Sequence, residues 1–269
     1  MNAPALILVA HGTRSARGVE MIAELAGAVT RELGASAFAE ATRYGAQTGA
    51  GADFGAASAS LREIAIGAPP RVRTAFVDVL GPSPAEVLRD LDSVPAVVVP
   101  AFLASGYHVY QDVPREVAAS AHDAVAVTQA MGPDPALAEV MHLRLRAAGW
   151  RPGDAVVFAA AGSSDSRARH DVQRAANLLS DRIGTPAHLA YIATGEPRVP
   201  EVVAAVRASG ERRVFIASYL LAHGLFHQRL HEAGADGVAE PIGIHPAVVR
   251  LLVSRYVSAT HALSVAEVA

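Results

Sequence analysis

The feature that most constrains the fold is an internal repeat, because the chain carries one pattern of strands and turns twice. Four blocks of the first half align without gaps with four blocks of the second half, in the same order. The aligned pairs are residues 8–13 with 158–163, 75–78 with 190–193, 103–106 with 221–224, and 132–136 with 243–247. Glycines and prolines at strand ends recur in both halves. The sequence therefore predicts two copies of one structural unit.

Each copy has the pattern of four consecutive strand–helix units. The run Val-Val-Val at 97–99 is typical of a strand buried on both faces, and Pro100 ends it because proline has no backbone donor. The expected strands are 6–10, 71–79, 97–99 and 124–128 in the first copy, and 156–160, 188–192, 214–217 and 238–239 in the second. Alternating strands and helices predict an α/β fold in which each copy is a four-stranded parallel sheet flanked by helices.

The repeat also sets the expected domain boundaries. Residues 1–149 form a first lobe that carries the active site, and residues 150–269 form a second lobe that is a degenerate copy. The stretch 35–69 is rich in alanine, glycine and serine and lacks a clear period. We expect it to be a loop insertion of the first copy only, with one helical turn around 58–66.

Three polar residues break the symmetry of the repeat. His11 and His108 follow strands of the first copy and Asp78 lies at the end of one, whereas Ala161, Phe226 and Ala193 take their places in the second. Glycines and prolines that the fold needs persist in both copies, whereas these side chains occur in only one. The difference is the one expected if the three residues serve chemistry.

The predicted strand order brings these side chains to one edge of the sheet. In a small flavodoxin-like sheet the order is 2-1-3-4, so that the strands before His11, Asp78 and His108 are neighbours. Neighbouring strands lie about 4.8 Å apart. Two imidazoles and a carboxylate with an open position are the ligands of a catalytic metal site. A strand-end aspartate is equally often a turn residue, which leaves the role of Asp78 open.

Composition limits the kinds of ligand and compartment. The 269 residues contain no cysteine, which excludes disulfides and thiolate sites, and the formal net charge of −3 gives no electrostatic footprint for nucleic acid. No signal peptide and no apolar run long enough to span a membrane is visible. We expect a cytoplasmic protein, with no nucleic-acid or membrane partner, that is a monomer or a homodimer.

The motifs resemble those of the class II chelatases of the sirohydrochlorin and cobalt-chelatase type, over nearly the whole chain. The matching stretches are 8–14, which includes His-Gly-Thr-Arg, 75–78 with Pro82 and Ser83, and 100–103 through Gly106, His108 and Asp112. The resemblance implies two flavodoxin-like lobes with a cleft between them and active histidines in the first lobe. The family usually has glutamate where this chain has Asp78.

The implied activity is that of a metal chelatase of the lyase class. It would insert a divalent metal ion, iron(II) for sirohaem or cobalt(II) for cobalamin, into sirohydrochlorin or a related tetrapyrrole, with no organic cofactor. His11 and His108 would deliver the metal and Asp78 would bind or orient it. We expect Arg14, Gly106, Tyr107 and His223 to bind the substrate. Arg14 is the candidate for a substrate carboxylate, because guanidinium binds carboxylates well.

Two alternatives remain open at this stage. His223, His227 and His231 are four residues apart, so on a helix they would share a face and could bind a metal. His223 is expected in the loop before that helix, which favours a cleft-lining role. The second alternative is a metal or tetrapyrrole binding protein that delivers its ligand without catalysis.

Overall fold

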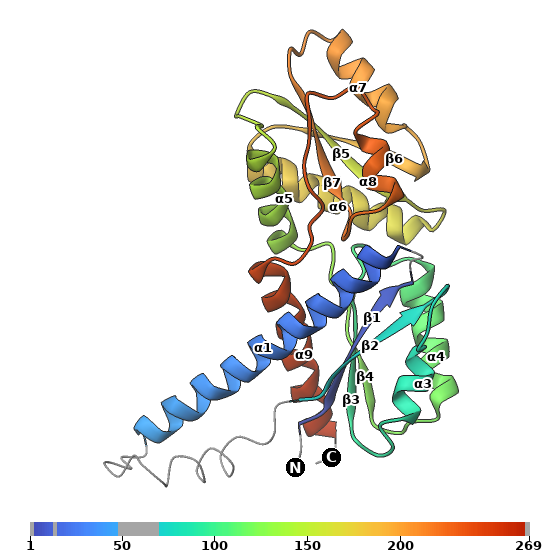
Figure 1. The fold of residues 1–269 in the computed structure, drawn as a ribbon, viewed down its shortest axis with the longest axis vertical. Coiled ribbons are helices and arrows are strands. Elements are labelled where there is room, and N and C mark those ends of the chain that lie inside the picture. The colour runs from blue at the N-terminus through green and yellow to red at the C-terminus, as the bar shows by residue number, and fades with distance from the viewer. Residues whose placement is uncertain (1–2, 13–14, 48–69, 267–269) are drawn as a thin grey trace.

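The computed structural model describes residues 3–12, 15–47 and 70–266, and it contains two four-stranded parallel sheets (Figure 1). The first sheet has the order β2-β1-β3-β4 and the second the order β6-β5-β7-β8. The strands are β1 (Ala5–His11), β2 (Val72–Val77), β3 (Ala96–Pro100), β4 (Val125–Val127), β5 (Ala155–Gly162), β6 (Ala187–Thr194), β7 (Val214–Tyr219) and β8 (Gly237–Val238). The predicted repeat, the parallel sheets and the 2-1-3-4 order are confirmed.

Helices cover both faces of each sheet. They are α1 (Ala16–Gln47), α3 (Pro84–Arg89), the π-helical turn η1 (His108–Asp112), α4 (Val113–Ser120), α5 (Pro135–Ala147), α6 (Ser166–Ile183), α7 (Val199–Ala208), α8 (Leu225–Leu230) and α9 (Pro246–Ala266). In the part of the chain that the structure describes, no helix is both long and apolar enough to cross a membrane.

Alternation along the central strands explains why the sheets are covered on both sides. In β1, Leu6 and Leu8 belong to the large core that includes α1 and α9, whereas Ile7 and Val9 belong to a second core with α3 and α4. Side chains of a strand point alternately to opposite faces, so a continuous apolar run buries both. The large core continues into the second lobe through Phe158, and the two lobes therefore share it.

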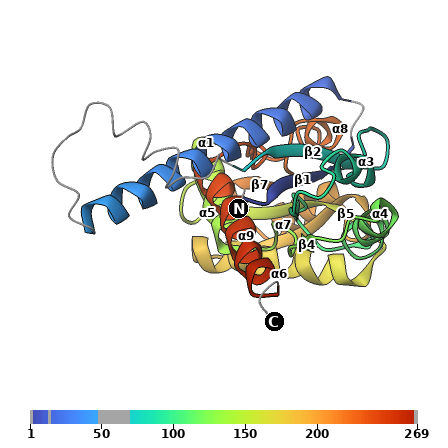
Figure 2. The same ribbon diagram turned by 90° about the horizontal axis from the view of Figure 1, so that it is seen from below.

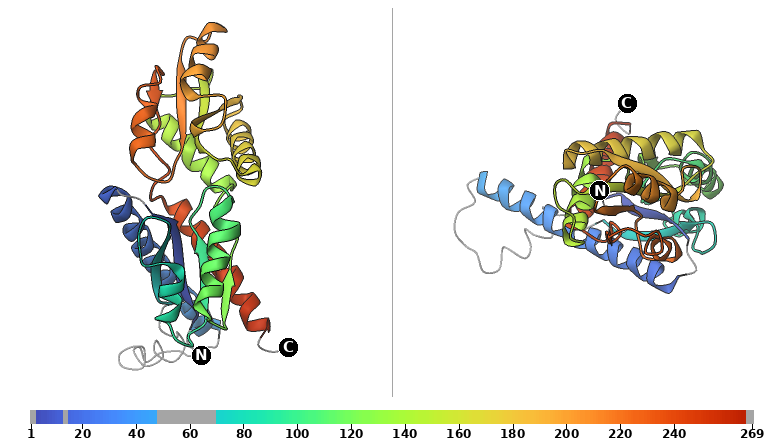
Figure 3. Two further views of the ribbon diagram at one scale, coloured as in Figure 1. Left: turned by 90° about the vertical axis from the view of Figure 1, so that its right-hand side faces the viewer. Right: turned by 90° about the horizontal axis from the view of Figure 1, so that it is seen from above.

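The two lobes exchange their last helices, and this corrects the expected boundary at residues 149 and 150. Helix α5 comes from the first repeat but packs on α6 and β7 of the second lobe. Helix α9 comes from the second repeat but crosses back and packs on α1, β3 and β4 (Figure 3). Repeats in sequence and lobes in space thus coincide for the strands and differ for these two helices.

The expected loop insertion at 35–69 is wrong in its first part. Helix α1 continues to Gln47, and its C-terminal end extends beyond the sheet (Figure 2). The stretch 35–47 contains five alanines, and alanine has the highest helix propensity. The remainder of the predicted insertion, including the helical turn around 58–66, lies outside the described residues.

Candidate active site

A cavity of about 830 Å³ lies between the two lobes. Its walls come from the carboxyl ends of β1 and β3 in the first lobe and of β5, β6 and β7 in the second, together with parts of α1, α6 and α8. In open parallel sheets, ligands bind at this edge of the strands. The cavity therefore occupies the position where the sequence predicts the site and the cleft.

His11 and His108 meet at the wall that the first lobe contributes. His11 is the last residue of β1, and His108 begins η1, eight residues after the end of β3 at Pro100. Their ring centroids are 4.8 Å apart and their planes stand at 88°. The predicted adjacency of strands 1 and 3 is what brings the two imidazoles together.

An oxygen acceptor orients each of the two rings. Nδ1 of His11 lies 2.7 Å from the carbonyl oxygen of Gly12, and Nδ1 of His108 lies 2.6 Å from Oδ2 of Asp112. A carbonyl or carboxylate oxygen only accepts, so Nδ1 of each ring carries the hydrogen and donates it. The lone pair of each neutral ring is then on Nε2, which is the nitrogen left to bind a metal ion.

Asp112 contacts a candidate histidine, and the analysis of the sequence did not propose a role for it. Its side chain is largely buried, with one oxygen on His108 and the other 2.7 Å from Arg115. The spacing of His108 and Asp112 by four residues was visible in the sequence as a helical pair. It could have indicated that a carboxylate holds the imidazole.

The structure does not place Asp78 with the two histidines. Strand β2 ends at Val77, and Asp78 is an exposed turn residue with φ 67°, whose carboxylate accepts the N–H of Val79 at 2.9 Å. It lines a separate hollow of about 300 Å³ together with Asp112. Among the described residues, no three His, Asp or Glu side chains converge as a metal site, so the predicted three-ligand set is not formed.

The remaining candidates line the cavity, with one exception. Gly106, Tyr107 and His223 belong to its walls, and the Tyr107 side chain is strongly exposed. His223 belongs to the second-lobe wall, so the cavity has imidazoles on both sides. The fourth candidate, Arg14, lies outside the described residues.

His223, His227 and His231 form a row of neighbouring rings in the second lobe. His223 precedes α8, which begins at Leu225, as the sequence predicts. The ring of His227 is 5.0 Å from that of His223 and 5.0 Å from that of His231, measured between centroids. His227 is buried, which lowers its pKa, and its Nε2 lies 3.2 Å from the carbonyl oxygen of Ala239.

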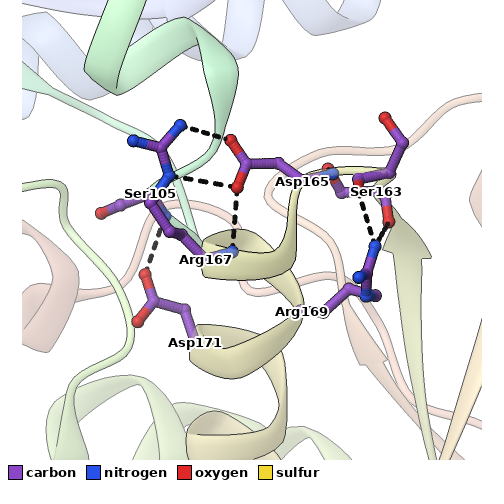
Figure 4. A network of polar contacts seen from close by, with 7 residues as sticks. Ser105, Ser163, Asp165, Arg167, Arg169 and Asp171 are labelled. Carbon is purple, nitrogen blue, oxygen red and sulfur yellow. Dashed lines mark hydrogen bonds and ion pairs between the residues drawn. The ribbon is translucent and has the colours of Figure 1, made fainter.

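Direct hydrogen bonds join the lobes beside the cavity. The backbone N–H of Ser105 donates to the carboxylate of Asp171 at 2.9 Å (Figure 4). The hydroxyl of Tyr219 donates to the carbonyl oxygen of Leu103 at 2.7 Å. Both bonds link the segment after β3 to the second lobe, and the sequence gave no signal for either.

The beginning of α6 adds a cationic contact to this junction. The guanidinium of Arg167 lies 4.2 Å above the ring of Tyr110 in η1. Arg167 also pairs with Asp165, and this contact lowers the pKa of the carboxyl group (Figure 4). Arg169 donates to the carbonyl oxygens of Ser163 and Ser164. These contacts place two arginines at the rim between the lobes.

The fold and the interlobe cavity define a two-lobe α/β protein of the chelatase-like architecture. The family model described as CbiX matches residues 49–148 and 155–259, which is more than half of the chain. The chain therefore belongs to the CbiX family, and the resemblance seen in the motifs is confirmed. The matched residues include His108, whereas His11 precedes them.

Solved structures with the same fold cover both chains nearly completely. SirB from Bacillus subtilis with Fe3+ has a TM-score of 0.74 at 20% identity, covering 98% of this chain and 97% of that one. The sirohydrochlorin chelatase SirB from Bacillus subtilis subspecies spizizenii, in complex with cobalt, has a TM-score of 0.69 at 18% identity, with 97% and 96% covered.

A third structure is that of CbiX, the terminal enzyme for biosynthesis of sirohaem in denitrifying bacteria. It has a TM-score of 0.61 at 20% identity, with 95% of this chain and 99% of that one covered. At these identities the likeness shows the shared fold. A search of curated proteins found no match.

Proposed function

We propose that this protein is a sirohydrochlorin chelatase that inserts iron(II) or cobalt(II) into the tetrapyrrole. The observation that supports it most strongly is the His11–His108 pair, in which an oxygen acceptor on each Nδ1 leaves both Nε2 atoms for one ion. Family membership and the structural likeness to SirB proteins with Fe3+ and with cobalt add support.

The spacing of the rings suits a shared ion. An imidazole bound at about 2.1 Å through Nε2 has its ring centre about 3 Å from the metal, so two such rings at a right angle have centres about 4.5 Å apart. The observed separation is 4.8 Å. With two protein ligands the metal substrate keeps open positions, which the pyrrole nitrogens need in order to take it over.

The cavity suits the flat apolar face of a large macrocycle. Its volume of about 830 Å³ lies within the range of sites that enclose whole ligands. Phe226 and Leu225 stand on the second-lobe wall and Tyr107 on the first-lobe wall, and all three are at least partly exposed. Gly106 and His223 complete the expected substrate contacts, with Arg14 as the candidate for a substrate carboxylate.

The reaction releases two protons for each metal ion inserted, because the ion replaces two pyrrolic N–H hydrogens. Neutral imidazole serves both as a metal ligand and as a base near neutral pH. After the ion leaves His11 and His108, the freed Nε2 of one ring accepts one pyrrole proton, and water accepts the other. Asp112 stabilises the charge that results on His108, because its carboxylate touches Nδ1 of that ring.

The decisive assay follows sirohydrochlorin by absorbance with the purified protein and, separately, iron(II), cobalt(II) and nickel(II). We expect turnover with at least one metal, and a loss of about 100-fold or more in His11→Ala and His108→Ala, because removing a ligand costs at least as much as removing its support. His188→Ala, an exposed histidine of β6, is the matched control and retains wild-type turnover.

Two results would contradict the proposal. The first is tetrapyrrole and metal binding without any acceleration of insertion, which would identify a delivery protein. The second is full activity in His11→Ala, which would remove the imidazole pair from the mechanism. The rates with the three metals also determine which ion the protein prefers, since borderline ligands bind all of them.

A further inference from the structure

A second pair of side chains of the types that bind metals includes one residue of the opposite wall of the cavity. Nε2 of His223 is 2.9 Å from Oε2 of Glu240, and both side chains are about half exposed, at 52% and 55%. His223 lines the cavity that also contains His11 and His108. The His11–His108 site does not use this pair.

The backbone beneath this pair is held in place. The carbonyl oxygen of Ala239 accepts the hydroxyl of Ser218 at 2.6 Å and lies 3.2 Å from Nε2 of buried His227. The N–H of Ala239 donates to Ile216 at 2.8 Å. Glu240 therefore follows a residue whose backbone is anchored to the second sheet.

The geometry of the pair is that of two neighbouring ligands on one ion. Ligand atoms bound at about 2.1 Å and separated by a right angle lie about 3 Å apart. The 2.9 Å that separates the two atoms in their direct ion pair is close to this spacing, so one ion could replace that contact with little movement. His227 stands next to the pair, with its ring 5.0 Å from that of His223, and its Nδ1 carries the lone pair because Nε2 donates to Ala239.

We propose that His223 and Glu240 form a second divalent-cation site, which captures the substrate ion on the second-lobe wall before it passes to His11 and His108. The inference rests on the proposed function for its role, while the site itself is a property of these side chains. In the described part of the chain no three ligating side chains converge, so the site has two protein ligands and water completes the coordination. An ion held this way exchanges readily, as a transfer site requires.

Counting bound Co²⁺ on the full-length protein by isothermal titration calorimetry tests the site without any tetrapyrrole. The wild type is expected to bind two equivalents. A double variant His11→Asn with His108→Asn keeps one equivalent, and a double variant His223→Asn with Glu240→Gln also keeps one. His188→Asn, which removes an exposed imidazole elsewhere in the second lobe, keeps two. The single variant His223→Gln provides a second and milder disruption of the site.

The result that would overturn the inference is wild-type stoichiometry in both His223→Gln and the His223/Glu240 double variant, which would leave an ordinary surface ion pair. Loss of all Co²⁺ binding in the His11/His108 double variant would overturn it as well. Two bound ions without sirohydrochlorin turnover would refute the proposed function and leave the site standing. Turnover with a single bound ion would refute only the site.

Discussion

At the scale of single residues, the site depends on which nitrogen of each imidazole is free. In each ring, Nδ1 donates a hydrogen bond to an oxygen: His11 to the backbone carbonyl of Gly12, and His108 to the carboxylate of Asp112. The backbone acceptor is fixed by the turn after β1, whereas the carboxylate is a side chain that can be replaced. Asp112 is therefore the residue at which the orientation of a candidate metal ligand can be tested.

Replacing Asp112 by asparagine is expected to lower kcat about 10–100-fold, because the amide can donate to Nδ1 and so move the lone pair away from Nε2. The KM for sirohydrochlorin should change little, since Asp112 does not line the main cavity. Steady-state kinetics measure both constants. Glu116→Gln removes a negative charge four residues further along, in α4, and is the control. Wild-type kcat in Asp112→Asn would show that the carboxylate does not orient the ring.

His142 is predicted to destabilise the protein in mild acid. Burial lowers its pKa below the ordinary value of 6.5, so the unfolded chain binds a proton first as the pH falls. Its stabilising contribution is complete above pH 6.5 and is lost as the pH falls toward the lowered pKa. His142→Phe keeps the edge-on contact with Trp150, now 5.7 Å between centroids, and removes the titration.

Urea unfolding at about pH 7.5 and 5.5 measures this effect. The free energy of unfolding should fall less in His142→Phe than in the wild type over this interval. His188→Asn removes an exposed imidazole and should leave the wild-type difference unchanged. An equal loss in wild type and His142→Phe would show that other groups account for the acid sensitivity.

At the scale of elements, the end of β5 depends on a glycine. Gly162 has φ +95°, and a Cβ there would collide with the backbone carbonyl of Thr194 in β6. Gly184, which ends α6 with φ +72°, has open space around it. We expect Gly162→Ala to cost about 3 kcal/mol or more, and Gly184→Ala about 1 kcal/mol from backbone strain alone. Equal losses in urea unfolding would show that β6 moves away without cost.

The strands and their order could be predicted from the sequence because apolar runs and strand-end glycines and prolines are local signals. The start of α3 also rests on a local signal: Ser83 accepts the N–H of Glu86, and Pro84 lies in the first turn. The extension of α1 to Gln47 was missed because an alanine-rich stretch without a period was interpreted as a loop. The exchange of α5 and α9 has no local signal at all, since it depends on packing between lobes.

Part of the candidate site could also be predicted from the sequence. Comparison of the two repeats singled out His11 and His108, and the strand order placed them together. The comparison of the repeats also singled out Asp78. This residue lies at the same edge of the sheet, but its backbone is left-handed and it does not join the two histidines. Asp112 was passed over because it follows His108 on the same element, and the repeat comparison looked only at strand ends.

At the scale of the whole molecule, the exchanged helices make the two lobes one structure. Helix α5 covers the second sheet and α9 the first, and one large core includes residues of both lobes. The hydrogen bond between the Tyr219 hydroxyl and Leu103 crosses directly from lobe to lobe at the cavity wall. The shape of the cavity therefore depends on contacts that also contribute to stability.

The variant Tyr219→Phe can separate the effect of this bond on the shape of the cavity from its effect on stability. The chain offers a matched control in Tyr256, whose hydroxyl donates to the carbonyl oxygen of Pro4 at 2.6 Å within the first lobe. Burial raises the pKa of Tyr219, and that of Tyr256 to about 12, so both phenols are protonated donors at neutral pH. Each phenylalanine variant should lose about 1–2 kcal/mol in urea unfolding, because one carbonyl oxygen is left without its partner.

Only Tyr219→Phe is expected to raise the KM for sirohydrochlorin, by severalfold, because of the two tyrosine bonds only that of Tyr219 holds the segment after β3 against the second lobe. Tyr256→Phe should keep the wild-type KM, since α9 and the start of β1 lie away from the cavity walls. Kinetics and unfolding on the same preparations compare the two variants directly. If both raise KM equally, the substrate responds to stability alone; if neither does, the lobes keep the cavity in shape through the exchanged helices without this bond.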